Sequence, residues 1–285
     1  SVLYLSPDGR KLREFKYSFN NNGYISEDLT FLSEDITEGD VLTSLAYAED
    51  PESILWMGTE EGNFLGNTRD FTTNIQGWHK HSCEWDIVDI CSMKVNGTNQ
   101  LWALIDNGSG LDVVRMGDQY LDNYDTQTIT SGIATTSIGP FTHLADEEVH
   151  VLTDGANDGN ITLNSAGTGT TATAGLEFVV GKDYPDAFIE SLNLDKGDPS
   201  GSAAALKKHW AKLFVYIIES AIPLINGVRP PTRSAGTAMG TVEALDTEYV
   251  QVPTRGHTRE GTVTIRQDLP FKTTIAAFMG TVKQK

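Results

Sequence analysis

Carboxylates are the side chains of this sequence with the greatest capacity for chemistry, because they can hold cations, act as acids or bases, or repel other anions. The 285 residues include 39 acidic and 21 basic side chains, which gives a net charge of −18. Residues 1–140 hold 22 of the acidic and only 8 of the basic side chains. A negatively charged surface repels phosphate, which argues against nucleic-acid binding by this part of the chain.

No Lys or Arg occurs between Lys16 and Arg69, and the carboxylates of this stretch are the candidate functional residues. They are Glu27, Asp28, Glu34, Asp35, Glu38, Asp40, Glu49, Asp50, Glu52, Glu60 and Glu61. An acidic surface also keeps a protein soluble, so the carboxylates could serve solubility alone or a specific function.

Two further groups could hold a metal ion. His79 and His81 are two residues apart, so on a strand they share one face, but only Cys83 and Glu84 lie nearby and neither has zinc-finger spacing. The run DGANDGN at 154–160 lacks the closing Glu of an EF-hand, which favours a plain turn. We therefore predict exposed strand histidines, no metal site and no cofactor.

Signatures of catalysis are absent from the sequence. There is no G-x-S-x-G, P-loop, H-E-x-x-H or C-x-x-C motif, and the repeated Asp box of sialidase propellers is missing. We predict that the protein is not an enzyme. Its two cysteines do not form a disulfide scaffold, which favours a reduced cytosolic origin, and no apolar run approaches the roughly 20 residues that cross a bilayer, so no membrane insertion is expected.

The elements that carry these residues repeat along the first half of the chain. An apolar strand with an aromatic residue, a Gly-containing turn and a returning strand recur at Val2–Phe15, Ser53–Thr68 and Gln100–Val114. A degenerate repeat of about 50 residues made of strands and turns is typical of β-propeller blades. We interpret the aromatic residues of the three copies as blade core, namely Tyr4, Trp56 and Trp102.

The second half has a different pattern. Residues 117–140 are polar and read as a connector, a new β-segment opens at Phe141–Gly155, Pro199–Trp210 resembles a capped helix, and residues 261–279 suggest a last hairpin. The predicted fold class is therefore mainly all-β. Residues 1–140 would form blades of an incomplete propeller, and residues 141–285 a β-rich second domain with one short helix near 200–210.

Several segments in a fixed order resemble a known family. GRKLREFKYSF, LAYAEDPESILWMGTEEGNFLG, GWHKH, QLWALI, FTHLADEEVHVLTDGA and GTVTIRQDLPFKTTIAAF are similar to the tail nozzle proteins of short-tailed bacteriophages, also called tail tubular protein B or packaged-DNA stabilisation protein. The resemblance covers nearly the whole chain and corresponds to the C-terminal portion of a full-length member. The closing motif departs from the family at Leu269-Pro270-Phe271, where Pro-Leu-Pro is usual, and the tract after Gly201 is more helix-like.

This resemblance implies a β-propeller with an appended or inserted β-domain. It implies a structural role in the virion tail, after assembly in the host cytoplasm, as a ring of about six copies that forms part of the DNA exit channel. The implied partners are further copies of the chain, the tail adaptor and portal-proximal proteins, tail fibre or spike proteins, and double-stranded DNA that passes through without specific binding. The acidic stretch would serve as a repulsive channel lining, because a wall that binds the duplex would stall ejection.

Two alternatives come from other functional classes. A glycan- or receptor-binding tail module could stack sugars on Trp56 and Trp102, and a propeller glycan hydrolase could use paired carboxylates. Each Trp lies inside an apolar run, however, where burial in the core is the ordinary outcome.

Overall fold

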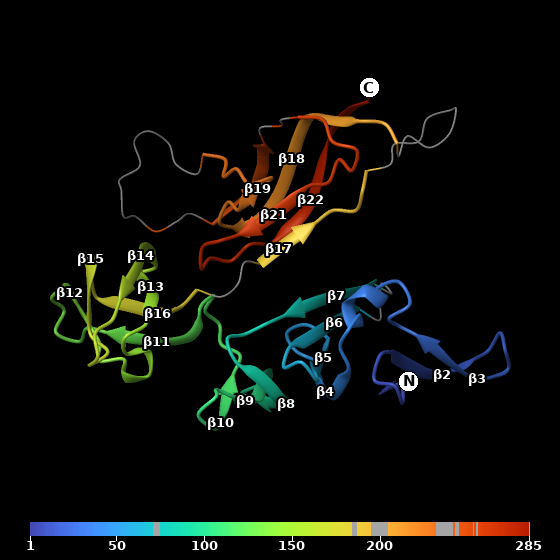
Figure 1. Ribbon diagram of the computed structural model, residues 1–285, viewed down its shortest axis with the longest axis horizontal. Coiled ribbons are helices and arrows are strands. Elements are labelled where there is room, and N and C mark those ends of the chain that lie inside the picture. Colours follow the sequence, from blue (N-terminus) through green and yellow to red (C-terminus); the bar gives the residue numbers. More distant parts are fainter. Residues whose placement is uncertain are drawn as a thin grey trace. The chain divides into compact units, whose positions relative to one another are not determined.

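The computed structural model describes residues 1–70, 75–183, 187–194, 205–231, 242, 245–252, 254 and 256–284. Over these ranges the regular elements are antiparallel β strands and two short 3-10 helices, so the predicted all-β fold class is confirmed (Figure 1). The chain divides into two compact units, Ser1–Asp118 and Gln119–Lys285. We call them unit 1 and unit 2 and describe each by itself.

Unit 1 contains three antiparallel sheets in which every strand pairs with its neighbour in the sequence. The first sheet consists of β1 (Val2–Leu5), β2 (Leu12–Ser18) and β3 (Gly23–Asp28). After the short helix η1 (Glu34–Thr37), the middle sheet consists of β4 (Leu42–Ala48), β5 (Ile54–Thr59), β6 (Phe64–Asp70) and β7 (Ile75–His81). The third sheet consists of β8 (Asp86–Val95), β9 (Thr98–Asp106) and β10 (Leu111–Arg115).

The three hairpins predicted from the repeat are present. They are β1–β2, β5–β6 and β9–β10, each paired in antiparallel register. The Asn-Gly signal between β8 and β9 also acts as expected, because Asn96 and Gly97 form a two-residue turn with φ of 51° and 94°. Two positive φ angles give the type I′ turn, whose twist matches that of the flanking strands.

Strand β5 of the middle sheet is buried on both faces, which explains why it reads as a continuous apolar run rather than an alternating one. Leu55 and Met57 point to one face and join a core with Leu12 of the first sheet. Trp56 points to the other face and packs in a core with Ile87 and other aliphatic residues of the third sheet. The three sheets therefore form one stack, and Trp56 is a core residue as predicted, with 6% of its surface exposed. Tyr4 and Trp102 are half-buried and lie outside both cores, so their prediction as blade core is wrong.

A buried ion pair crosses from the first sheet to the middle one. Glu14 on β2 is 2% exposed, and its carboxylate lies 2.7 Å from Arg69 on β6 and 3.2 Å from Lys16. Burial opposes ionisation of Glu14, but the bonds from Arg69 and Lys16 outweigh it and lower the pKa to about 2. Glu14 is therefore ionised at neutral pH and depends on its cationic partners.

Unit 2 contains two separate cores. The first lies between the sheet of β11 (Asp122–Thr128), β16 (Glu177–Lys182), β13 (Glu148–Thr153) and β14 (Ala156–Thr162) and the pair β12 (Thr135–Ile138) and β15 (Gly169–Gly175). Its centre includes Phe178, Val151 and, from the short helix η2 (Thr142–Leu144), Leu144.

The second core of unit 2 lies between two three-stranded sheets. One is β17 (Ala187–Glu190), β21 (Thr264–Gln267) and β19 (Leu224–Ile225); the other is β20 (Asp246–Val252), β18 (Lys208–Ser220) and β22 (Ile275–Gln284). Alternate residues of β18, among them Leu213 and Val215, face this core together with Ile265 of β21.

Three predictions for the second half are corrected. The connector at 117–140 instead supplies β11 and β12, which pair with β16 and β15, so the boundary lies at Asp118 rather than at residue 140. The predicted helix is wrong at its end, where Lys208 already begins β18, and residues 195–204 lie outside the described residues. The last hairpin is wrong because β21 pairs with β17 and β19, whereas β22 pairs with β18.

The Glu14–Arg69 pair yields a stability prediction. Substituting Arg69→Met leaves the buried Glu14 carboxylate without its main counter-ion, which should cost about 3–5 kcal/mol of the free energy of unfolding. Urea titration at pH 7 measures the loss. The matched control is Lys94→Met, since Lys94 pairs with Asp50 at 2.8 Å on the surface, with side chains 52% and 47% exposed; it should cost less than about 1 kcal/mol. Equal losses in the two variants would contradict the dependence of the buried Glu14 carboxylate on Arg69.

Candidate functional site

The candidate site is built where one end of the middle sheet meets the third sheet. The turn after β5 reaches Gly62, whose carbonyl oxygen accepts the Ile87 N–H at 2.9 Å. Gly62 has φ of 79°, and a Cβ at that position would lie 2.8 Å from Cβ of Asp86. Because β8 begins at Asp86 and pairs there with Asp106, the last residue of β9, three strand ends converge at this place.

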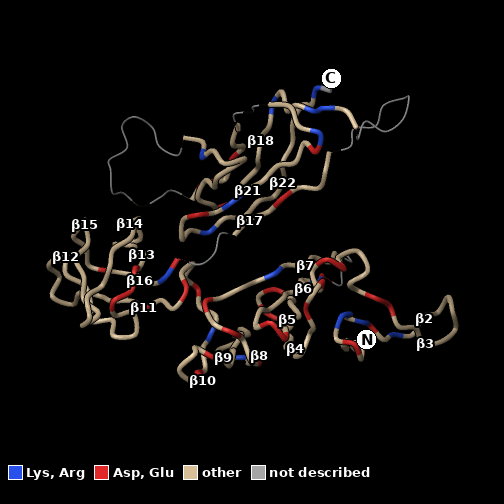
Figure 2. The backbone as a smooth tube through the Cα atoms, in the orientation of Figure 1, with Lys and Arg blue, Asp and Glu red and all other residues tan. Residues whose placement is uncertain are grey.

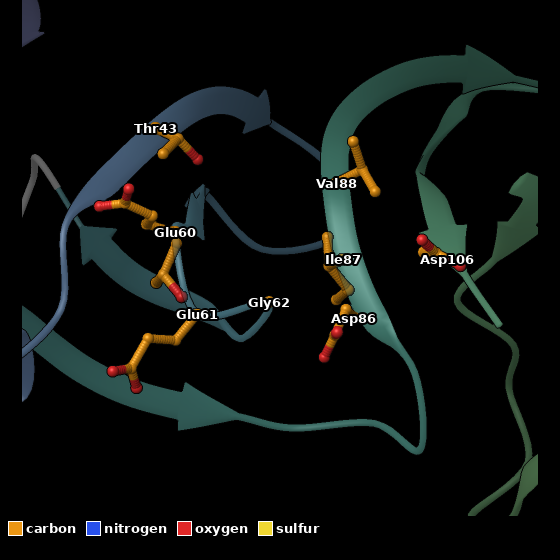
Figure 3. A pocket seen from close by; sticks show the side chains of 9 residues that line it. Thr43, Glu60, Glu61, Gly62, Asp86, Ile87, Val88 and Asp106 are labelled. Carbon is orange, nitrogen blue, oxygen red and sulfur yellow. The ribbon is translucent and has the colours of Figure 1, made fainter. Parts of the chain in front are cut away.

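An open pocket of about 520 Å³ lies at this convergence, and we call it the acidic pocket. Four carboxylates line it, and none of the described residues that line it is Lys or Arg. Figure 3 shows Glu60 and Glu61 on the turn after β5, Asp86 at the start of β8 and Asp106 on the neighbouring β9. The lining residues are Thr43, Thr59, Glu60, Glu61, Gly62, Asp86, Ile87, Val88 and Asp106.

Backbone hydrogen bonds hold the acidic turn in place. Asp40 is buried, and its Oδ1 accepts the N–H groups of Val41 at 2.8 Å and Glu61 at 3.2 Å. Burial raises the pKa of Asp40, but the Thr59 hydroxyl and these N–H groups favour the carboxylate and hold the pKa below its usual value. Asp40 therefore stays ionised and fixes the position of Glu61 from behind the surface.

The structure does not bring all eleven predicted carboxylates together. Glu60 and Glu61 line the acidic pocket, and Asp40 supports them. Glu49, Asp50 and Glu52 lie in the turn between β4 and β5, at the opposite end of the middle sheet, because Leu42 pairs with Thr59 at one end and Ala48 with Ile54 at the other. Along a strand of seven residues the two ends are roughly 20 Å apart.

The remaining members of the set lie on or near η1 and the first sheet. Glu34 and Asp35 belong to η1 and Glu38 follows it, on the exposed surface. Asp28 is paired with Lys11 at 2.8 Å, and Glu27 is paired with Lys16. Asp28 and Glu27 are thus partly neutralised, whereas the acidic pocket lacks such partners among its described lining.

Sequence reasoning missed Asp86 and Asp106. Both lie beyond Arg69, outside the stretch without basic residues, so a search for one continuous acidic run could not include them. Their signal is positional, because one stands at the first residue of a strand and the other at the last residue of its partner. Figure 2 shows the acidic positions of unit 1 as red segments, several of them near β4 and β5.

The arrangement of the acidic pocket favours repulsion of anions. Within the described parts of the chain, no group of three or more His, Cys, Asp or Glu side chains is placed to hold a metal ion. With four carboxylates and no cation in the described lining, the acidic pocket has a negative potential that opposes the approach of phosphate. It offers no hydrogen-bond donor side chain apart from the hydroxyls of Thr43 and Thr59.

The two histidines share one face of β7, but their predicted exposure is wrong. His79 Nδ1 lies 2.6 Å from His81 Nε2, and His79 Nε2 lies 2.9 Å from the Thr68 hydroxyl. The His81 ring stacks on Phe64 with centroids 4.9 Å apart. The imidazoles of His79 and His81 both contact the indole of Trp56. Burial lowers the pKa of both imidazoles, that of His81 to about 4 with a further contribution from His79.

Comparison with known proteins gives no match: no model of a protein family matches the chain, and no curated protein is significantly similar to it. Among the described residues, none forms a helix that is long and apolar enough to span a membrane.

The half-buried histidine pair of His79 and His81 makes stability depend on pH. Below the ordinary pKa of 6.5 the imidazoles of the unfolded chain bind protons, whereas the folded imidazoles, with their lowered pKa values, do not. The free energy of unfolding should therefore decrease as the pH is lowered below 6.5. Each unit of pKa depression corresponds to about 1.4 kcal/mol. Urea titrations between pH 7 and pH 5 should show this slope in the native chain, and His81→Phe should flatten it.

The exposed His143 of unit 2 is the matched control, and His143→Phe should retain the native slope. An unchanged slope in His81→Phe would mean that the pH dependence does not come from the His79–His81 pair, whatever the overall stability of that variant.

Gly62 gives a test of how the acidic pocket is held. Substituting Gly62→Ala places a methyl group 2.8 Å from Cβ of Asp86 and imposes a positive φ on a residue with a Cβ, which should cost about 1–3 kcal/mol. Thermal unfolding followed by tryptophan fluorescence measures the loss. Gly108 has φ of 78° but open space around it, so Gly108→Ala separates the cost of backbone strain from that of the collision. Equal losses would mean that the turn does not press against Asp86.

Proposed function

We propose that the chain is a structural component of the virion of a short-tailed bacteriophage, part of the tail nozzle through which DNA leaves the particle. The observation that carries this proposal is the ordered resemblance described above, which begins at Gly9 and closes at Phe278. In this role the protein would retain or release packaged DNA. It would have no catalytic activity and no cofactor.

The stacked sheets of unit 1 support a β-propeller within this proposal. A four-stranded antiparallel meander such as β4–β7 is the form of a propeller blade. The first and third sheets pack on its two faces, as neighbouring blades do. Unit 1 would then supply three consecutive blades, and unit 2 would be the appended β-domain.

The acidic pocket supports a conduit. Duplex DNA carries one negative charge per about 1.7 Å of its axis, so a wall that pairs with phosphate would hold it at many points. Carboxylates fixed at the ends of β5, β8 and β9 would instead keep the duplex at a distance. We propose that this end of unit 1, rather than the turn between β4 and β5, faces the channel.

The partners follow from the same proposal. The chain would assemble with further copies of itself in a ring of about six. The ring would contact the tail adaptor and portal-proximal proteins above it and fibre or spike proteins beside it, in a tail assembled in the host cytoplasm. Double-stranded DNA would pass through without specific binding.

Electron microscopy of the purified chain mixed with portal and adaptor proteins of a short-tailed phage tests this proposal. We expect closed rings with a central channel that excludes a short DNA duplex. Rings of the variant Glu60→Lys/Glu61→Lys should hold duplex density in the channel, because the repulsive wall becomes attractive. The matched control is Glu49→Lys/Glu52→Lys, with the same charge change at the opposite end of the middle sheet.

The outcomes separate two parts of the proposal. Persistent monomers in the presence of portal and adaptor would count against the nozzle. If only rings of the Glu49→Lys/Glu52→Lys variant retain DNA, the nozzle proposal stands. In that case the turn between β4 and β5 faces the channel instead of the acidic pocket.

A further inference from the structure

The sheet of β20, β18 and β22 in unit 2 buries only one of its two sides. Leu213 and Val215 of β18 point into the core, so the alternating Phe214 and Tyr216 point outward. Residues that pair with Phe214 and Tyr216 across the strands share the outward side. They are Tyr249 and Gln251 on β20 and Ala277 and Met279 on β22. We call this surface the β18 face.

The β18 face is basic at one end. Trp210 packs against the core, so its neighbour His209 and the cross-strand residue Lys283 point outward. Lys212 pairs with Thr281 on the same side, past a local irregularity in the register. Figure 2 shows blue positions near the C-terminus, beside which β18 begins.

A second imidazole enlarges this basic end. The ring of His257 stacks on that of His209, with centroids 4.8 Å apart. Nδ1 of His209 donates a hydrogen bond of 2.7 Å to the carbonyl oxygen of Gly256, which holds the ring in place. His257 itself is exposed, so the pair presents an open ring face to the solvent.

The charge of the β18 face is opposite to that of the chain, whose net charge is −18. None of the described residues that point out of this face is Asp or Glu; Glu248 pairs with the buried Ile217 and therefore lies on the other side. Lys212 and Lys283 are exposed, and neither forms an ion pair with a described residue. An ammonium group donates hydrogen bonds and accepts none, so these lysines suit a partner with negative acceptor groups.

Next to the lysines, the β18 face presents an open aromatic ring. Tyr216 and Tyr249 stack with centroids 4.5 Å apart and an interplanar angle of 23°. Tyr216 is half-buried, whereas Tyr249 is 57% exposed. Because β20 is the edge strand, no further strand of this sheet covers the other side of the Tyr249 ring. Such a ring offers a flat surface on which another flat ring can stack.

Negative acceptor groups and flat rings occur together in nucleic acids. A duplex keeps its bases stacked on one another, so only a single strand has base faces free for an aromatic side chain. We propose that the β18 face binds single-stranded nucleic acid, with phosphates on Lys212 and Lys283 and a base stacked on Tyr249. An acidic polysaccharide fits less well, because its hydroxyl groups need acceptors as well as donors and the described residues of the β18 face include no carboxylate.

The length of the β18 face suits a short stretch of such a strand. Six residues of β22 separate Lys283 from Ala277, the cross-strand neighbour of Tyr216, which corresponds to about 20 Å. Single-strand binding sites of about 4–16 nucleotides are common in β-sheet folds. The inference goes beyond the proposed nozzle, which concerns a duplex repelled by unit 1, and it does not depend on that proposal.

Fluorescence anisotropy of a labelled oligothymidine of about 15 nucleotides, titrated with the whole chain at about 50 mM salt, tests the β18 face. We expect the single strand to bind, and a duplex of the same length to bind at least about tenfold more weakly. Tyr249→Ala should weaken binding to the single strand at least about fivefold, because a stacking surface is lost. Tyr249→Phe keeps the ring and should bind like the native chain.

The dependence on salt tests the lysines separately. Lys212→Gln should reduce the slope of log K against log salt by about 0.7, the value for one phosphate contact on a single strand. The matched control is Lys272→Gln, because Lys272 pairs with Glu219 at 3.4 Å near the other end of β18. It carries the same charge change and should keep the native slope. Circular dichroism verifies that the variants are folded.

Four outcomes would overturn the proposal. They are no binding of the oligothymidine by the native chain at about 100 μM, equal affinity for the duplex, native-like binding by both Tyr249→Ala and Lys212→Gln, and equal displacement by polygalacturonate at the same concentration of charge. The last result would identify an acidic polysaccharide as the partner. None of them bears on ring formation, which the experiment with portal and adaptor proteins decides.

Discussion

Burial of strand β5 on both faces is the constraint on which unit 1 depends. Strand β5 cannot shift by one residue, because that would exchange Met57 with Trp56 and place each side chain in the wrong core. This fixed register sets where β5 ends, and therefore where Glu60 and Glu61 emerge beside Asp86. The acidic pocket is a consequence of packing in the core.

Charge and apolar packing are kept apart in unit 1. Sheet faces carry the apolar side chains, while most carboxylates lie in turns and at strand ends, where water reaches them. Two carboxylates are buried: Glu14 pairs with Arg69 across two sheets, and Oδ1 of Asp40 accepts two backbone N–H groups. The excess of carboxylates in unit 1 is tolerated because most of them lie in water, where the high dielectric weakens their mutual repulsion.

Local patterns in the sequence predict the hairpins well and the long-range pairing poorly. The turn at Asn96–Gly97 and the apolar run of β5 contain their own signals, since turn geometry and burial act over a few residues. Nothing local indicates that Ala187 pairs with Gln267, and polar residues 122–128 gave no sign of a strand. For the site, Glu60 and Glu61 were predicted as residues of an acidic run, but their meeting with Asp86 depends on sheet packing that no spacing in the sequence encodes.

The order of pairing has a consequence for synthesis of the chain. In unit 1 each strand finds its partner among its immediate neighbours, so loop closure costs little and each sheet can form as soon as its last strand leaves the ribosome. In the second core of unit 2, β17 must wait for β21, and β18 must wait for β20 and β22. Unit 1 can therefore be complete while the last sheets are still being translated, and the apolar residues of β18 stay open to chaperones until β20 and β22 have emerged.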